Sequence, residues 1–251
     1  MAAIIEVKNL IKKYGTFTAV NNISFSVEEG EIFGILGPNG AGKTTTLEMI
    51  EGLKKPTSGT ITLDGKDVVR ETDAVKALIG VQLQASTFFE NLNLVELIDV
   101  FASMYNRQVD AMALLGEVEL TDKAKAYAKE LSGGQRQRLS IAVGLVNDPK
   151  VIFLDEPTTG LDPQARRHLW DLVETIKAKG KTVVITTHYM DEAEVLCDRV
   201  AIMDSGKIIA LSTPQLLIEQ LLKSGFTKPV VQQQANLEDV FLTMTGHALR
   251  D

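Results

Sequence analysis

The residues best suited to chemistry lie in a short glycine-rich segment, residues 37–45, with the sequence Gly-Pro-Asn-Gly-Ala-Gly-Lys-Thr-Thr. Glycines let the backbone turn tightly, so that successive N–H groups converge on one anion, and Lys43 adds a mobile positive charge. The hydroxyl of Thr44 is placed to ligate Mg²⁺, which bridges the terminal phosphates of a nucleotide. The segment therefore predicts a phosphate site made of Gly37, Pro38, Asn39, Gly40, Ala41, Gly42, Lys43, Thr44 and Thr45.

The flanks of this segment fit a phosphate-binding loop. An apolar run at residues 31–36 precedes it, and a helical pattern at residues 46–50 follows. The loop should therefore join a buried strand to a helix N-terminus, where free N–H groups and the helix dipole favour an anion. A glycine-rich turn without a function is the alternative, and the two flanks make it the weaker one.

Two neighbouring carboxylates close a second apolar run, residues 151–154. Continuous hydrophobicity indicates a buried parallel strand, and ligands of open α/β sheets bind at the carboxyl ends of such strands. We expect Asp155 to hold Mg²⁺ and Glu156 to polarise the attacking water. An acidic pair by itself is more often a helix cap or a solvated loop, but the phosphate loop shifts the balance towards function.

A third segment, Leu-Ser-Gly-Gly-Gln at residues 131–135, carries a specific resemblance. With it, the chain resembles the nucleotide-binding subunit of an ATP-binding cassette (ABC) transporter over nearly its whole length. The resemblance implies ATP and Mg²⁺ as ligands, ATP hydrolysis, and a homodimer or heterodimer of cassettes that sandwiches two ATP molecules head to tail. It also implies that Ser132, Gly133, Gly134 and Gln135 open a helix whose N-terminus caps the γ-phosphate held by a partner subunit. The motif is equally an ordinary helix start capped by Ser132, and both interpretations can hold together.

Other positions take their roles from the same resemblance. Tyr14 matches the aromatic residue that stacks on adenine, Asp162 the loop that crosses the dimer interface, and His188 the switch histidine that senses the γ-phosphate. Gln84 matches the glutamine that reaches Mg²⁺ and the attacking water, although Gln82 would lie on the same side of an extended strand and stays the alternative. The expected catalytic residues are Glu156, His188 and Gln84, and the expected metal ligands are Thr44, Gln84 and Asp155.

Composition limits the possible location and partners of the chain. The 251 residues are 45% hydrophobic and carry a net charge of -7, and Cys197 is the single cysteine. No run approaches the roughly 18 residues of a membrane span, and the first residues lack the pattern of a signal peptide. The negative charge argues against a general nucleic-acid binder. We expect a cytoplasmic subunit, peripheral on the cytoplasmic face of the membrane, that works with a transmembrane permease subunit on a separate chain and with no nucleic acid.

The elements that position these residues predict an α/β fold. It consists of a P-loop NTPase core, a mixed sheet with helices on both faces, plus an antiparallel β subdomain and an inserted helical subdomain. Alternating apolar and polar residues at 4–30 and 60–65 favour antiparallel strands, whereas spacings of three and four at residues 94–105 indicate an amphipathic helix. We expect the ABC ATPase domain at residues 1–225, its helical subdomain at about 85–148, and a C-terminal extension at 226–251.

The last segments of the chain point to a subfamily. A hairpin at residues 200–210 and a helix at 215–222 precede residues 236–242, which are similar to the ending of cassettes that serve exporters of drugs, antibiotics and lipids. The permease should dock near residues 86–92, where Phe88 or Phe89 fills a partner's groove or packs in the local core.

Two other classes of function compete with transport. One is a soluble ABC ATPase that acts on nucleic acid or ribosomes. The segment between Lys43 and Ser132 lacks the heptads of DNA-organising relatives, and the chain carries a single cassette where ribosome-acting relatives usually carry two. The other is a scaffold without turnover, which the presence of both Glu156 and His188 disfavours. The cargo, the direction of transport and the identity of the permease are not encoded in these residues.

Overall fold

The computed structural model of the chain describes residues 3–82 and 88–227. Contacts divide the chain into two compact units, residues 1–217 and 218–251. Helix α8 (Pro214–Lys223) begins in the first unit and ends in the second, and it confirms the helix expected at residues 215–222. The domain boundary expected after residue 225 stays a prediction, and residues 236–242 lie outside the described part of the chain.

The smaller sheet of the first unit is antiparallel, as the alternating segments predict. Its order is β2-β1-β4-β5, and its strands are β1 (Ala3–Tyr14), β2 (Phe17–Glu28), β4 (Ser58–Leu63) and β5 (Lys66–Asp67). In β2 the side chains of Ile23, Phe25 and Val27 are buried, while Ser24 between them is exposed. Successive side chains of a strand point to opposite faces, so this sheet packs one face on the core.

The larger sheet is mixed and holds the carboxyl ends at which the site forms. Its order is β10-β9-β3-β8-β7-β6, parallel except for the β9–β10 hairpin. The strands are β3 (Ile32–Leu36), β6 (Ile79–Gln82), β7 (Val151–Asp155), β8 (Thr182–Thr187), β9 (Arg199–Asp204) and β10 (Lys207–Ser212). In β7, Val151 and Phe153 pack in one hydrophobic cluster and Ile152 and Leu154 in the other. Burial of both faces explains why these strands are continuously apolar.

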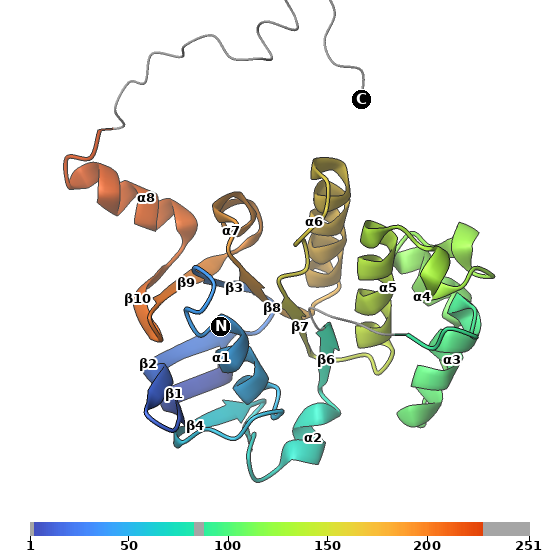
Figure 1. The fold of residues 1–251 in the computed structure, drawn as a ribbon, viewed down its shortest axis with the longest axis horizontal. Coiled ribbons are helices and arrows are strands. Elements are labelled where there is room, and N and C mark those ends of the chain that lie inside the picture. The colour runs from blue at the N-terminus through green and yellow to red at the C-terminus, as the bar shows by residue number, and fades with distance from the viewer. Residues whose placement is uncertain (1–2, 83–87, 228–251) are drawn as a thin grey trace, which may run out of the picture. The chain divides into compact units, whose positions relative to one another are not determined.

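Helices cover both faces of the larger sheet. Leu47 of α1 belongs to the cluster shared with the smaller sheet, whereas Ile98 of α3, Leu139 of α5 and Val173 of α6 belong to the cluster on the other face. Figure 1 shows α3, α4 and α5, which contact one another, side by side in green tones. The helices are α1 (Lys43–Ile50), α2 (Thr72–Lys76), α3 (Leu94–Met104), α4 (Ala111–Glu117), α5 (Gly133–Leu145), α6 (Pro163–Ala178) and α7 (Met190–Leu196), with short 3₁₀ turns η1 (Thr121–Lys123) and η2 (Ala128–Glu130).

The helical segment between β6 and β7 is attached to the sheet by a direct backbone contact. A Cβ atom at Gly80 of β6 would lie 2.0 Å from the carbonyl oxygen of Gly144 in α5. No side chain can stand between the two backbones, so α5 packs directly on the edge strand of the sheet. Gly80 lies shortly before residues 83–87, which are outside the described part of the chain.

Candidate nucleotide site

The phosphate loop is held against neighbouring strands so closely that only glycine fits at two of its positions. Gly42 has a φ of +100° and directly precedes α1, and a Cβ atom there would lie 2.5 Å from the carbonyl oxygen of Ala19 in β2. A Cβ atom at Gly37 would lie 2.2 Å from the carbonyl oxygen of Met203 in β9. No side chain caps the N-terminus of α1, so the first N–H groups of the helix are left for an anion.

A cavity of about 560 Å³ opens at this N-terminus. It brings the phosphate loop together with the carboxylate after β7 and the histidine after β8, which are far apart in the sequence. The adjacent carboxyl ends of β3, β8 and β7 make this possible, because parallel neighbours present those ends at one edge. The lining residues are Phe17, Ala19, Asn39, Gly40, Gly42, Lys43, Thr44, Thr45, Glu156, Thr159 and His188.

Lys43 lies folded back into the loop rather than extended into solvent. Its side chain is 4% exposed, and Nζ donates to the carbonyl oxygens of Gly37 at 2.9 Å and Pro38 at 3.2 Å. Nζ also lies 3.1 Å from Oε1 of Glu156. The ammonium group is therefore already positioned where a phosphate would meet it, and a bound phosphate competes with Glu156 for it.

Glu156 is held in a backbone conformation that non-glycine residues seldom adopt. Its φ is +47°, and its N–H donates to the carbonyl oxygen and the hydroxyl of Thr186. Oε2 lies 3.1 Å from Nδ1 of His188 and accepts from the hydroxyl of Thr159 at 3.3 Å. Burial raises the pKa of Glu156, but the hydrogen bond and charge of Lys43, followed by the charge of His188, outweigh burial and hold this pKa below its ordinary value. Glu156 is therefore an ionised acceptor at neutral pH, as a general base must be.

Asp155 faces the first turn of α1. Its Oδ1 accepts from the hydroxyl of Thr44 at 3.2 Å and, through a short bond, from the hydroxyl of Thr186. Burial raises the pKa of Asp155, and the two hydroxyl bonds only partly offset it. A nearby divalent cation would favour the ionised form of this carboxylate. The carboxylate and the hydroxyl of Thr44 are hard oxygen donors on the same side of the loop, which is the type of ligand that Mg²⁺ prefers.

The signature residues, at positions 131–135, begin α5 beside a different hollow, the signature hollow. Ser132 caps α5 in a capping box, in which its hydroxyl accepts from the N–H of Gln135 and the Gln135 side chain accepts from the N–H of Ser132. Asp162 caps α6 by a single bond, in which its carboxylate accepts from the N–H of Ala165 at 2.8 Å. The two helix starts border a hollow of about 230 Å³ lined by Ser132, Gly134, Gln135, Arg138, Asp162, Gln164, Ala165 and His168. Of the residues that the structure describes, none lines both this hollow and the phosphate cavity.

Comparison with known proteins agrees with this geometry. The sequence profile of the ABC transporter family matches residues 20–159. The chain belongs to the ABC transporter family. It is the ATP-binding and ATP-hydrolysing subunit, the cassette, of such a transporter. The family membership confirms the resemblance read from residues 131–135, and the structure confirms the expected fold class.

Similar proteins cover the chain from end to end. It is 38% identical to the Nod factor export ATP-binding protein I of Burkholderia orbicola, over 99% of both chains, and 40% identical to the protein of that name from Cupriavidus metallidurans, over 100% of both. An ATP-binding cassette of an ABC transporter in its ADP conformation superimposes with a TM-score of 0.79 and 28% identity, covering 89% of this chain and 96% of that one. A dimeric cassette in a post-hydrolysis state, bound to ADP and phosphate, gives a TM-score of 0.74 and 29% identity, covering 83% and 98%.

A second aromatic candidate for stacking on adenine lies at the cavity, and the role expected of Tyr14 stays a prediction. Tyr14 ends β1 and does not line the cavity; the ammonium groups of Lys12 and Lys54 lie 5.1 Å and 6.0 Å from its ring centre. Phe17, paired with Tyr14 across the turn of the hairpin, lines the cavity and is 61% exposed. Phe17 is therefore a second candidate, and an aromatic residue next to a hairpin turn is the sequence signal that points to it.

Replacing Phe17 with alanine is expected to weaken ATP binding at least about fivefold, because stacking on a base contributes on the order of 1 kcal/mol or more. The matched control is Tyr14→Ala, which removes the neighbouring ring that does not line the cavity and should change affinity less. Titration of both variants with ATP by calorimetry checks the expectation. A larger loss of ATP affinity for Tyr14→Ala than for Phe17→Ala would assign the stacking role to Tyr14.

The glutamine expected at the metal site is not described by the structure. Gln84 lies among residues 83–87, outside the described part of the cassette. Gln82 is the last residue of β6, pairs in register with Leu154 and is fully buried. A buried strand residue does not suit a side chain that must reach the site from a loop, so Gln84 remains the residue that we expect there.

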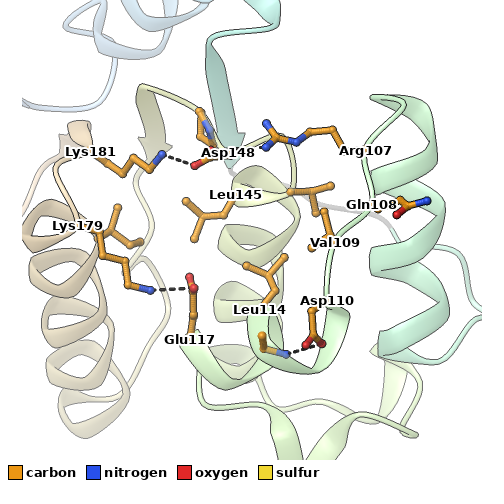
Figure 2. Close-up of a pocket in the computed structure, with 14 residues that line it drawn as sticks. Arg107, Gln108, Val109, Asp110, Leu114, Glu117, Leu145, Asp148, Lys179 and Lys181 are labelled. Atoms are coloured by element: carbon orange, nitrogen blue, oxygen red, sulfur yellow. Dashed lines mark hydrogen bonds and ion pairs between the residues drawn. The ribbon is translucent and has the colours of Figure 1, made fainter.

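A separate hollow of about 300 Å³ lies between α4, α5 and the end of α6 (Figure 2). Its charges are already paired: Glu117 lies 2.9 Å from Lys179, and Asp148 pairs with Lys181 and with Arg107. With these cations engaged by carboxylates, the hollow offers a phosphate none of the free donors found at the N-terminus of α1. The ion pairs join α4 and the residues before it to the ends of α5 and α6.

Glu51, directly after α1, makes the stability of the cassette depend on pH. Its side chain is 1% exposed, and neither carboxylate oxygen has a hydrogen-bond partner among the described residues. Burial, followed by the charges of Asp155 and Glu48, raises the pKa of Glu51 from 4.5 to about 8. The folded chain therefore binds this proton more tightly than the unfolded chain, and the resulting stability is complete below pH 4.5 and is lost as the pH rises to about 8.

We expect Glu51→Gln, which mimics the neutral acid, to stabilise the cassette at pH 8.5 by on the order of 3 kcal/mol more than it does at pH 5.5. Urea unfolding of both proteins at the two pH values measures this difference. Equal effects of the substitution at both pH values would show that the carboxyl of Glu51 is not the group that titrates.

Proposed function

We propose that the cassette powers an exporter, working as one of two cassettes bound to a transmembrane permease carried by a separate chain. Support for export comes from the relatives named Nod factor export ATP-binding protein I, which match the cassette over its whole length. The permease would contact the region near residues 86–92. There Phe88 packs against the core, whereas Phe89 is 50% exposed and therefore the better candidate for a partner's groove.

Within one cassette, the phosphate cavity would bind and activate the nucleotide. Lys43 and the N–H groups of the loop neutralise the phosphates. Glu156 takes the proton of the attacking water, and its strained backbone and short contacts fix its direction towards the cavity. His188, whose Nδ1 contacts the same carboxylate, orients Glu156 and lies where the γ-phosphate would be sensed. Most of the catalysis is positioning and charge neutralisation, which this arrangement supplies.

Thr44 and Asp155 would hold Mg²⁺, with Gln84 as the third expected ligand. Their oxygens fit the ion, which usually takes one or two protein ligands together with substrate phosphates and water. In agreement with that sparse set, the described residues contain no cluster of three or more histidine, cysteine, aspartate or glutamate side chains that could form a complete metal cage. When bound, Mg²⁺ neutralises the negative charge that develops on the phosphates.

The observation that carries the proposed dimer is the separation of the two hollows. The phosphate cavity lacks the signature residues, and the signature hollow holds Ser132 and Asp162 without any residue of the phosphate loop. Each hollow is half of a site, so two cassettes facing head to tail would complete two sites. The dimeric structure of a similar cassette bound to ADP and phosphate supports dimerisation.

Mixing two inactive variants tests the shared sites. Lys43→Ala disables the phosphate loop, and Ser132→Asp keeps a good helix cap while placing a negative charge against the γ-phosphate. Each variant alone should be inactive. A one-to-one mixture should recover up to about a quarter of the wild-type ATPase rate, because half of randomly assembled dimers contain one intact site. If the mixture stays inactive, the signature residues do not complete a site in trans.

Co-purification tests the role in transport. The tagged cassette, isolated from detergent-solubilised membranes, should carry a hydrophobic permease with it, and Phe89→Ser should weaken that association more than Phe17→Ser does. Recovery with ribosomes or nucleic acid in place of a permease would overturn the transport proposal in favour of the soluble alternative.

A further inference from the structure

Glu192 is a buried carboxylate behind the active site that neither the phosphate loop nor the signature hollow uses. It lies on α7, four residues after His188, and its side chain is fully buried. Oε1 accepts from the indole N–H of Trp170 on α6 at 3.1 Å. Burial raises the pKa of Glu192, and the hydroxyls of Thr187 and Thr158, followed by Trp170, oppose that rise. Burial of a carboxylate is energetically costly unless neighbouring groups donate hydrogen bonds to it.

The two threonines that act on the pKa of Glu192 are close in sequence to both proposed catalytic side chains. Thr187 ends β8 directly before His188, and its hydroxyl oxygen accepts from the N–H of Tyr189 at 3.0 Å, which leaves the hydroxyl proton for another acceptor. Thr158 lies two residues after Glu156, in the segment that leads to Asp162. Glu192 is therefore close to one threonine beside the switch histidine and to another in the segment that begins with the strained Glu156.

Thr158 lies near Glu192 but leaves a hydrogen bond unmade. The hydroxyl of Thr158 and Oε2 of Glu192 are both buried and neither has a hydrogen-bond partner among the described residues, although Thr158 is near enough to affect the pKa of the carboxyl. A buried donor and a buried acceptor that lie close to each other and stay unpaired are costly, and a small shift of either segment would pair them. The segment from Glu156 to Asp162 borders both hollows, so it is the one that a bound nucleotide and a second cassette would move.

We propose that Glu192 is a positioning residue that couples the Glu156–Asp162 segment to His188, by accepting a hydrogen bond from Thr158 when the site closes around ATP. Trp170 holds the carboxylate in place, and Thr187 transmits its position to the switch histidine. The inference rests on the proposed roles of Glu156 and His188. It concerns the alignment of those two side chains and leaves the phosphate-binding groups unchanged.

Steady-state kinetics of Glu192→Gln separates positioning from folding. The amide keeps the shape of the side chain and one acceptor oxygen but cannot accept on both sides, so kcat should fall roughly tenfold to a hundredfold, as for a misaligned reacting group, while the KM for ATP stays within about twofold. Glu194→Gln, an exposed neighbour on α7, is the matched control and should behave as wild type. An unchanged kcat, or a loss that tracks a fall in melting temperature, would overturn the proposal.

A double-mutant cycle with Thr158→Val tests the specific bond. Thr158→Val removes the hydroxyl with little change in shape and should lower kcat by a similar factor. The double variant should fall no further than the worse single variant, because both changes remove one interaction. If the factors by which the two substitutions lower kcat multiplied in the double variant, the two residues would act independently, which contradicts the bond.

The single tryptophan gives a readout that does not depend on turnover. Trp170 is the chain's only tryptophan, and its indole N–H is bonded to Glu192. In a Glu156→Gln background, ATP should change the emission of Trp170, and adding Glu192→Gln should abolish that change while ATP still binds. If Glu156→Gln keeps full turnover, the proposed function fails; if Glu156→Gln is inactive but Glu192→Gln is normal in rate and emission, only this inference fails.

Discussion

Glu156→Gln is expected to bind ATP but to hydrolyse it at least about a hundredfold more slowly than the wild type, since loss of one preorganised catalytic group costs roughly 3 to 4 kcal/mol. The carboxylate lies 3.1 Å from the ammonium of Lys43 and 3.1 Å from Nδ1 of His188. Glutamine keeps these neighbours at similar distances but cannot take a proton from water. Phosphate release under saturating ATP measures the effect, and unchanged turnover would remove Glu156 from the role of base.

The same variant reports on the sandwich of two cassettes. Without hydrolysis the γ-phosphate persists, so ATP should shift the variant from monomer to dimer in size-exclusion chromatography with light scattering. Glu174→Gln, an exposed carboxylate on α6, serves as the control and should hydrolyse ATP normally. If neither wild type nor variant turns over and neither dimerises, the permease is needed to assemble the site, and the measurements move to the complex.

Lys43→Ala is expected to weaken ATP binding at least about thirtyfold, because a hydrogen bond to a charged group contributes about 2 kcal/mol or more. The ammonium is buried within the loop and bonded to Gly37 and Pro38, and among residues 3–82 and 88–227 no other lysine or arginine lines the phosphate cavity. Calorimetric titration with ATP checks the loss. A variant that retains native affinity would contradict the phosphate-binding role.

A control for charge and one for folding accompany this variant. Lys54→Ala removes a lysine that pairs with Glu48 away from the cavity, so its ATP affinity should stay close to wild type. Removing Lys43 also deprives the buried carboxylate of Glu156 of a partner at 3.1 Å, which by itself destabilises the fold. Lys43→Ala/Glu156→Gln removes that unpaired charge, and its affinity should remain low although its melting temperature recovers.

Sequence reasoning succeeded where a local pattern has one physical meaning. The apolar runs before Gly37, Asp155 and His188 are three strands of one sheet, and their carboxyl ends meet because parallel neighbours share an edge. It does not distinguish the two candidates for stacking on adenine, because Tyr14 and Phe17 flank the same turn and only the path of the hairpin places the ring of Phe17 at the cavity. It also overlooked Glu192, since nothing in the pattern of a short helix shows that a glutamate points inward.

By itself, the sequence determined the family, the α/β fold and the groups that meet the phosphates. Those properties depend on backbone conformations and burial patterns that neighbouring residues specify, such as glycine where φ is positive or apolar residues on both faces of a strand. Only the tertiary structure decided that Glu156 contacts both Lys43 and His188, that the signature residues lie in a separate hollow, and that Glu192 is buried. These relations join segments that are distant in the chain, so they depend on how strands and helices pack and not on the spacing of residues.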